Sequence, residues 1–163
     1  MTTKLFFSIV FLCIGTLLQE FFLPHIALFQ VSPDIMTIFI VFIAITVDQK
    51  RSTSFGFAAG ILTGIFSGNM GLNMLARTIE GFIAGYFHIP EESHATSRQK
   101  TRRFYMAILA ACFCGNAVMS AGYNPLGLTP AYRIIVLGFL ESLFTLMLAL
   151  ILNWLFLRKS FAD

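Results

Sequence analysis

The chain has 163 residues, of which 57% are hydrophobic and 12% are charged. About a quarter of the residues in a soluble domain are charged, so this composition excludes a soluble globular domain and indicates an integral membrane protein. The net charge of +3 is small and gives no reason to expect nucleic-acid binding. The length accommodates five or six spans of about 20 residues with short loops. We therefore expect one integral membrane domain over residues 1–163.

Cysteines and histidines form no pattern typical of a metal site, a disulfide framework or a catalytic set. The cysteines are Cys13, Cys112 and Cys114, and the histidines are His25, His88 and His94. The cysteines fall in apolar runs outside any C-x-x-C pair, and the histidines lie in predicted loops without metal-ligand spacing. We therefore expect no enzymatic activity, no cofactor and no bound metal.

Six apolar segments separated by turns predict an all-α, polytopic bundle of six transmembrane helices. The predicted spans cover about residues 5–22, 33–47, 53–68, 72–87, 104–123 and 134–156. Lys4 followed by an apolar run imitates a signal peptide, but no small-residue cleavage site follows, so we expect an uncleaved first span. Residues 23–30 are too apolar for an open loop and contain Pro24, which predicts an interfacial segment or a short helix that folds back.

The second predicted span opens at Pro33 and Asp34. Proline suits the first turn of a helix, and a carboxylate near the N-terminus complements the helix dipole. We expect both residues to fix the outer mouth of this span. The span ends at Val47, so it has about 15 residues and a length of roughly 22 Å, which is short.

The third predicted span has a glycine at every fourth position of an otherwise apolar segment. Residues four apart lie above one another on one face of a helix. Gly56, Gly60, Gly64 and Gly68 therefore form a column of nearly bare backbone, which lets a neighbouring helix approach closely in a bilayer. Two interpretations are open: the column packs against another helix of this chain, or it receives a helix of a partner protein.

Basic residues lie almost entirely on one side of the predicted membrane. That side collects Lys4, Lys50, Arg51, Arg98, Lys100, Arg102, Arg103, Arg158 and Lys159. The other side has Arg133, and Arg77 lies within a span. The positive-inside rule then places both termini in the cytoplasm, which agrees with an even number of spans. We interpret the basic part of the hydrophilic stretch 88–103 as a topology determinant on anionic lipid, with docking to a cytoplasmic filament as the alternative.

Ionisable residues inside the predicted spans gather in one layer. Asn73, Arg77 and Glu80 share a helical stripe through their spacings of four and three residues. Arg77 and Glu80 lie roughly 9 and 12 Å below the outer surface by helix rise, and Glu141 lies about 10 Å down. We expect Arg77 to pair with Glu80 or Glu141 as a buried brace between helices. The alternatives are an outward-facing cavity for a solute or a partner, and a proton relay.

Short motifs recur along nearly the whole chain. They are a first span ending in Gln19, Pro33-Asp34, Gly56-Phe57-x-x-Gly60-Ile61-Leu62, Ser67-Gly68, Gly71-Leu72 and Gly81-Phe82-x-x-Gly85-Tyr86. Together with the span order, they resemble the family of the rod shape-determining membrane protein MreD. That family usually has an aspartate four residues after the second glycine of the ladder. Here the position is Gly64, so no role of that aspartate carries over.

The resemblance implies a non-enzymatic subunit of the bacterial cell-elongation (rod) complex, in the cytoplasmic (inner) membrane, that regulates cell shape and lateral peptidoglycan synthesis. The implied partners are the single-span periplasmic protein MreC, the wall synthases RodA and penicillin-binding protein 2, the actin-like MreB, and membrane lipids. The family is also distantly similar to the S components of energy-coupling-factor transporters, whose six-helix fold we expect here. An S component that binds a vitamin or small solute is therefore the alternative function, with a cavity lined by Arg77, Glu80 and Glu141.

Overall fold

The computed structural model describes residues 2–27, 31–90, 96–124 and 127–157. Within these ranges the chain forms helices and no β-strand, so the predicted all-α class is confirmed. The α-helices are α1 (Thr2–Leu17), α2 (Ile35–Thr46), α3 (Gln49–Ser67), α4 (Met70–Gly85), α5 (Ser97–Gly122), α6 (Pro130–Tyr132) and α7 (Gly138–Leu152). Shorter elements are the π-helical turns η1 (Leu18–Phe22), η3 (Arg133–Leu137) and η4 (Asn153–Leu157), and the 3₁₀ turn η2 (Leu23–Ile26).

Each of the six predicted spans overlaps one helical segment, but several boundaries differ. α3 begins at Gln49, four residues before the predicted start at residue 53. α2 has 12 residues, which corresponds to about 18 Å, so it is shorter than predicted. α5 begins at Ser97, well before the predicted start near Phe104. Gln99 Oε1 accepts a hydrogen bond from Thr96 N at 3.1 Å and so satisfies one backbone donor at that start. The basic residues that we predicted in a loop therefore lie on the first two turns of α5.

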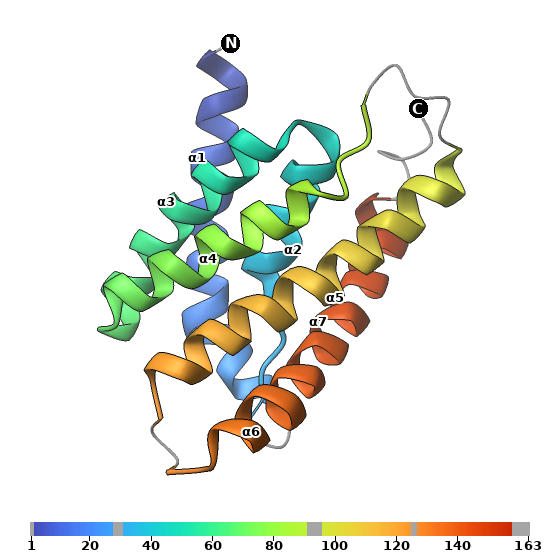
Figure 1. Cartoon of the computed structure of the whole chain (residues 1–163). Helices are drawn as coiled ribbons and strands as arrows, with labels where there is room; N and C mark the ends of the chain where they lie inside the picture. Colours follow the sequence, from blue (N-terminus) through green and yellow to red (C-terminus); the bar gives the residue numbers. More distant parts are fainter. Residues whose placement is uncertain (1, 28–30, 91–95, 125–126, 158–163) are drawn as a thin grey trace.

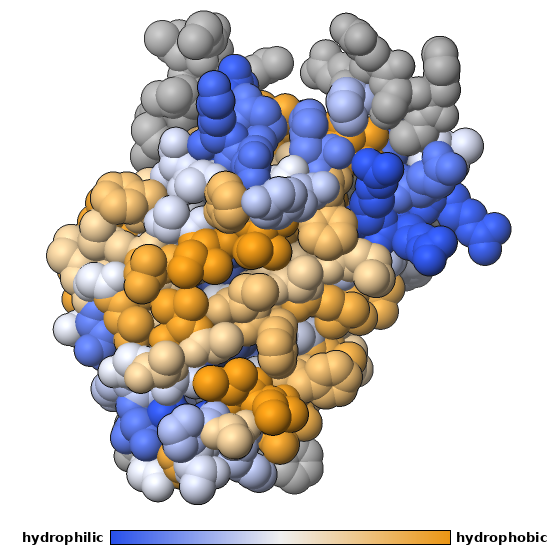
Figure 2. All heavy atoms as spheres, viewed as in Figure 1, coloured by the Kyte–Doolittle hydropathy of each residue, from blue (hydrophilic) through white to orange (hydrophobic). Residues whose placement is uncertain are grey.

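Among the residues that the structure describes, two helical segments are long and apolar enough to cross a membrane, Ser97–Gly122 and Pro130–Leu155. Val10–Ile26 and Ile35–Thr46 are apolar but shorter. Figure 2 shows a wide band of hydrophobic surface between two more hydrophilic ends of the molecule. The six-span arrangement and the orientation of the termini stay predictions.

α2 is the central helix of the bundle. It contacts α1, α3, α4, α5 and α7, and in Figure 1 it lies behind α4. Eight of its 12 residues are buried. Because protein surrounds α2, the polar groups at its ends can be satisfied by neighbouring side chains rather than by water.

Two apolar clusters hold α2 in place. The first contains Val41 of α2 together with Phe104 and Ile108 of α5, all fully buried. The second contains Leu12 of α1, Ile40 of α2 and Ala59 of α3. Packing on both sides fixes the position of α2, and with it the position of the polar residues at its N-terminal end.

The segment predicted to lie in the interface or to fold back is described as far as Ala27. Leu23–Ile26 form the turn η2, in which Pro24 occupies the first turn and Leu23 is buried. A short helical turn therefore connects α1 and η1 to the start of α2, while residues 28–30 lie outside the described ranges.

α3 and α4 form the closest helix pair of the fold, side by side in Figure 1. Gly68 ends α3 with a φ of 76°, a left-handed conformation that glycine adopts without steric cost. Its N–H donates to Gly64 O, so the chain turns sharply into α4. Gly68 is thus the C-cap of α3, and nothing lies within 4 Å of the position that a side chain would take there. The prediction that it belongs to the packing column is wrong.

The other three glycines of the column face α4 of the same chain. A Cβ on Gly60 would lie 2.7 Å from Asn73 O and 2.8 Å from Met74 N, and a Cβ on Gly64 would meet Met70. A Cβ on Gly56 would overlap the main chain of Arg77. Backbone atoms cannot move aside as a flexible side chain can, so these positions require glycine for the observed approach.

Glycines of α4 make the reciprocal contact. A Cβ on Gly81 would lie 2.8 Å from Ser52 C and 2.9 Å from Thr53 Cα, and a Cβ on Gly85 would overlap the side chain of Gln49. Ser52 also donates from Oγ to Gly81 O at 2.9 Å. Both helices therefore contribute bare backbone to one shared interface.

Candidate functional site

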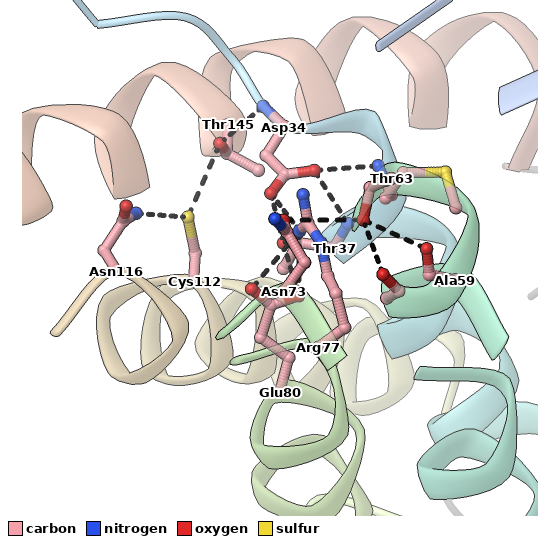
Figure 3. A network of polar contacts seen from close by, with 12 residues as sticks. Asp34, Thr37, Ala59, Thr63, Asn73, Arg77, Glu80, Cys112, Asn116 and Thr145 are labelled. Carbon is pink, nitrogen blue, oxygen red and sulfur yellow. Dashed lines mark hydrogen bonds and ion pairs between the residues drawn. The ribbon is translucent and has the colours of Figure 1, made fainter. Parts of the chain in front are cut away.

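Four buried polar side chains from α2 and α4 meet in the interior. Arg77 Nη1 of α4 forms a close ion pair with Asp34 Oδ2, which caps α2, and a second with Glu80 Oε2 at 3.0 Å. Thr37 of α2 completes the group, with its Oγ1 3.1 Å from Arg77 Nη1. Figure 3 shows these side chains converging from the two helices. All four are buried, and Arg77 is 9% exposed. We call Asp34, Thr37, Arg77 and Glu80 the polar cluster.

Asp34 has two structural roles at once. Its Oδ1 accepts hydrogen bonds from Met36 N at 2.9 Å and Thr37 N at 3.1 Å, so it is the N-cap of α2. Its Oδ2 pairs with Arg77. The start of α2 is thereby tied to the middle of α4.

Thr37 lies between the two carboxylates. Its Oγ1 is 2.9 Å from Asp34 Oδ2 and 3.0 Å from Glu80 Oε2. A hydroxyl has one proton to donate, while its oxygen can accept from Arg77. The polar cluster thus offers one guanidinium and one hydroxyl proton to two buried carboxylates, and loss of Arg77 would leave both carboxylates without a counter-charge at low dielectric.

A glycine on α5 makes room for Glu80. A Cβ on Gly115 would lie 2.7 Å from both Cδ and Cγ of Glu80. The carboxylate of Glu80 therefore rests against the bare backbone of α5 on one side and faces Arg77 on the other. The three helices α2, α4 and α5 all contribute to holding this group.

Hydrogen bonds extend the polar cluster to α7. Asp34 N donates to Thr145 Oγ1 of α7 at 3.0 Å, and Cys112 Sγ of α5 donates to the same oxygen at 3.6 Å. Asn116 Nδ2 lies 3.6 Å from Cys112 Sγ. This chain of contacts, visible in Figure 3, joins α4, α2, α7 and α5.

Glu141 does not pair with Arg77, although we predicted Glu80 or Glu141 as its partner. The ion pairs of Arg77 within the described residues are those with Asp34 and Glu80. Glu141 lies in the first turn of α7 and forms no ion pair with any described residue. The physical reason is the position of α2, because its capped end lies between α4 and α7 and brings Asp34 to Arg77 first.

Asn73 was predicted as part of the same stripe but makes its bonds elsewhere. Its Nδ2 donates to Ser67 Oγ at 2.8 Å and to Asn69 O at 3.0 Å. Thr63 Oγ1 lies 3.5 Å from Asn73 Oδ1. Asn73 therefore holds the turn between α3 and α4, rather than the charged group one turn further along.

Gln19 fastens the end of the first helical segment to the start of α2. Its Oε1 accepts from Ile35 N at 2.9 Å, and its Nε2 lies 3.5 Å from Pro33 O. Ile35 N is one of the first N–H groups of α2, which have no partner inside the helix. Gln19, Pro33 and Asp34 thus form one arrangement that positions this helix end inside the bundle.

The sequence did not predict the pairing of Arg77 with Asp34, because the two residues were expected at different depths in the membrane. We placed Asp34 at the outer mouth of its span and Arg77 roughly 9 Å below that surface by helix rise. The short length of α2 was the available signal, since a helix of 12 residues surrounded by others can begin below the surface.

Arg133 was counted as a loop charge but is buried, with 7% of its surface exposed. Its Nη2 donates to Tyr123 O at the C-terminal end of α5. The end of α5 is thereby bound to the turn η3, which leads into α7. No spacing rule in the sequence indicates this contact, because the two residues lie in different helical segments.

The arrangement fits a static brace. Each ion-pair partner is fixed by a packed helix, and the hydrogen-bonding groups of the polar cluster are directed at one another rather than at an opening. Among the described residues, no three His, Cys, Asp or Glu side chains come together as a metal site.

No protein-family model, no curated protein and no solved structure matches this chain. Functional conclusions therefore depend on the residues and their geometry.

Proposed function

We propose that this chain is a six-span protein of the bacterial cytoplasmic membrane, with both termini in the cytoplasm, that serves as a non-enzymatic scaffold of the cell-elongation complex in the manner of MreD. The observation that carries the proposal is the meeting of the two glycine motifs behind the resemblance. Gly56 and Gly60 of α3 pack on α4, and Gly81 and Gly85 of α4 pack on α3. Four of the glycines that suggest the family are thus positions where the fold requires glycine.

The polar cluster also supports a scaffold. Arg77 is engaged by Asp34 and Glu80 inside the bundle, and Thr37 links both carboxylates. A solute carrier needs polar groups that are free to receive a ligand, whereas a scaffold needs helices held at fixed positions. Mutual pairing of buried charges favours the second use.

The glycine column is not the partner surface in this proposal. α4 covers Gly56, Gly60 and Gly64, which are all buried. Contact with MreC then has to use a face of the bundle that the chain leaves exposed. RodA, penicillin-binding protein 2 and MreB join through the larger complex.

The experiment is deletion of the gene, combined with co-purification of the tagged chain from membranes. Loss of the chain is expected to turn rods into spheres, and re-expression restores rods. The tagged chain is expected to bring down a single-span protein whose periplasmic part is a coiled coil. Re-expression of Gly71→Ala serves as a positive control for complementation. Nothing lies within 4 Å of the added Cβ, so this variant should restore shape fully.

The opposite result identifies the alternative S component. In that case the cells keep their shape, and the purified chain carries a small ligand at stoichiometric levels and depends on an ATPase module. Such a result would overturn the scaffold proposal, and it would mean that the polar cluster opens to receive a solute.

A further inference from the structure

A cavity of about 580 Å³ lies between the start of α5 and the last helical segment, at Asn153, where α7 passes into η4. It is lined by Ser97, Arg98, Thr101, Arg102, Tyr105, Met106 and Asn153. The lining is graded along α5: two arginines and two hydroxyls occupy the first two turns, and the ring of Tyr105 and the thioether of Met106 follow. A polar rim above an apolar wall matches the headgroup and glycerol region of a phospholipid.

The length of α5 places this cavity at a membrane surface. Its 26 residues extend about 39 Å, whereas the hydrocarbon core of a bilayer is about 30 Å thick. The excess corresponds to roughly six residues at 1.5 Å each. If Gly122 lies at the outer boundary, residues 97–102 project beyond the inner one. The basic rim of the cavity then lies at the depth of the lipid phosphates.

The charges on this rim lack partners within the described part of the chain. Arg98 and Arg102 are exposed, and the ion pairs found among the described residues involve only Arg51 and Arg77 as cations. Arg98 and Arg102 are four residues apart and so lie on the same face of α5. Guanidinium groups bind phosphate oxygens in a bidentate manner, which fits two arginines around one phosphodiester.

Asn153 joins the two helical segments that border the cavity. Its Nδ2 donates to Tyr105 Oη at 2.7 Å, while its Oδ1 is buried without a hydrogen-bond partner among the described residues. This bond ties the last helical segment to α5 about one turn below Arg102.

We propose that this cavity binds the headgroup of an anionic phospholipid from the inner leaflet, with Arg98 and Arg102 on the phosphate. The site anchors the cytoplasmic end of α5 against the last helical segment. The inference rests on the proposed membrane topology, but it is independent of the cell-shape role and of any protein partner.

The chain contains its own probe for the test. Trp154 is the single tryptophan, follows Asn153 directly and is 74% exposed. The full-length protein is reconstituted in phosphatidylcholine bilayers with increasing fractions of phosphatidylglycerol that is brominated on its acyl chains. Bromine quenches tryptophan fluorescence on contact, so the quenching curve reports which lipid lies beside Trp154, the residue that follows Asn153 of the cavity lining. Brominated phosphatidylcholine is the reference lipid.

We expect phosphatidylglycerol to be preferred over phosphatidylcholine by about ten-fold or more, since each arginine near the surface contributes roughly five-fold. The variant Arg98→Gln/Arg102→Gln should lose most of this preference while its circular dichroism is unchanged. The matched control is Lys50→Gln/Arg51→Gln, which removes the same charge on the same predicted side but away from the cavity, and it should keep the preference.

Three results would overturn the proposal. Equal quenching by both lipids would mean that no headgroup site exists, and equal loss in the two double variants would reduce it to general surface charge. Displacement of brominated phosphatidylglycerol by inorganic phosphate at constant ionic strength would assign the site to free phosphate. If neither brominated lipid quenches Trp154, the membrane topology itself is wrong, which distinguishes failure of the underlying proposal from failure of this one.

Discussion

The α3–α4 contact and the α2–α4 contact join the same helix to its neighbours by opposite means. Toward α3, α4 presents glycines and main-chain atoms, and the two backbones approach each other directly. Toward α2, it presents Arg77 and Glu80, which are held by Asp34 and Thr37. One interface is specified by shape and the other by charge and hydrogen bonding.

The comparison shows why α4 can hold the bundle together. Close backbone approach gains dispersion energy over a long contact but tolerates sliding by one turn, because the glycines repeat every four residues. A buried ion pair contributes little net stability, yet it is strongly unfavourable in any register that separates the partners. We infer that the glycine interface supplies most of the adhesion and that the polar cluster sets the register.

The largest expected effect follows from removing the cation. Arg77→Met leaves Asp34 and Glu80 buried without a counter-charge and should lower the free energy of unfolding by about 3–5 kcal/mol. Unfolding of the purified protein in detergent measures this change. The triple variant Asp34→Asn/Arg77→Met/Glu80→Gln should recover part of the loss, because it removes the uncompensated charges as well.

The control for that experiment is Arg51→Met. Arg51 is exposed and lies 3.6 Å from Asp48, so its loss should cost less than about 1 kcal/mol. If Arg77→Met is no more destabilising than Arg51→Met, the polar cluster is hydrated, and an outward-facing cavity replaces the brace.

The next largest effect is expected from adding a methyl group to the close α3–α4 interface. In Gly60→Ala the added methyl group meets the main chain of α4, and overpacking of this kind costs about 1–3 kcal/mol. Gly71→Ala on α4 has open space around the new methyl group and should gain up to about 1 kcal/mol of helix stability. Opposite signs in thermal unfolding would verify the interface, whereas equal changes would mean that α3 and α4 do not touch at Gly60.

The smallest effect is expected for the hydroxyl between the two carboxylates. Thr37→Val keeps the shape of the side chain but removes the hydrogen bonds of Oγ1, which should cost about 1–2 kcal/mol. Thr53→Val is the comparison, since the hydroxyl of Thr53 bonds, among the described residues, only to Gln49 O of its own helix and is less buried. Similar unfolding free energies for the two variants would mean that Thr37 does not link the carboxylates.

Much of the secondary structure could be predicted from the sequence, because it depends on local properties. Apolar runs separated by turn residues predicted six helical segments. The four-residue spacing predicted that Gly56, Gly60 and Gly64 share one face of a helix. The start of α5 was placed too late. The polar composition of residues 97–103 indicates exposure, but polar residues at the end of a long helix give the same signal as a loop.

The sequence by itself determined the helical class, the apolar character of the chain, the helix start at Asp34 and the bare face of α3, since each depends on residues close together in the chain. Only the tertiary structure decided which helix covers that face and which carboxylate reaches Arg77. Those choices depend on the position of α2 between α4 and α7, which results from many weak packing contacts between distant segments and cannot be inferred from the spacing within any one of them.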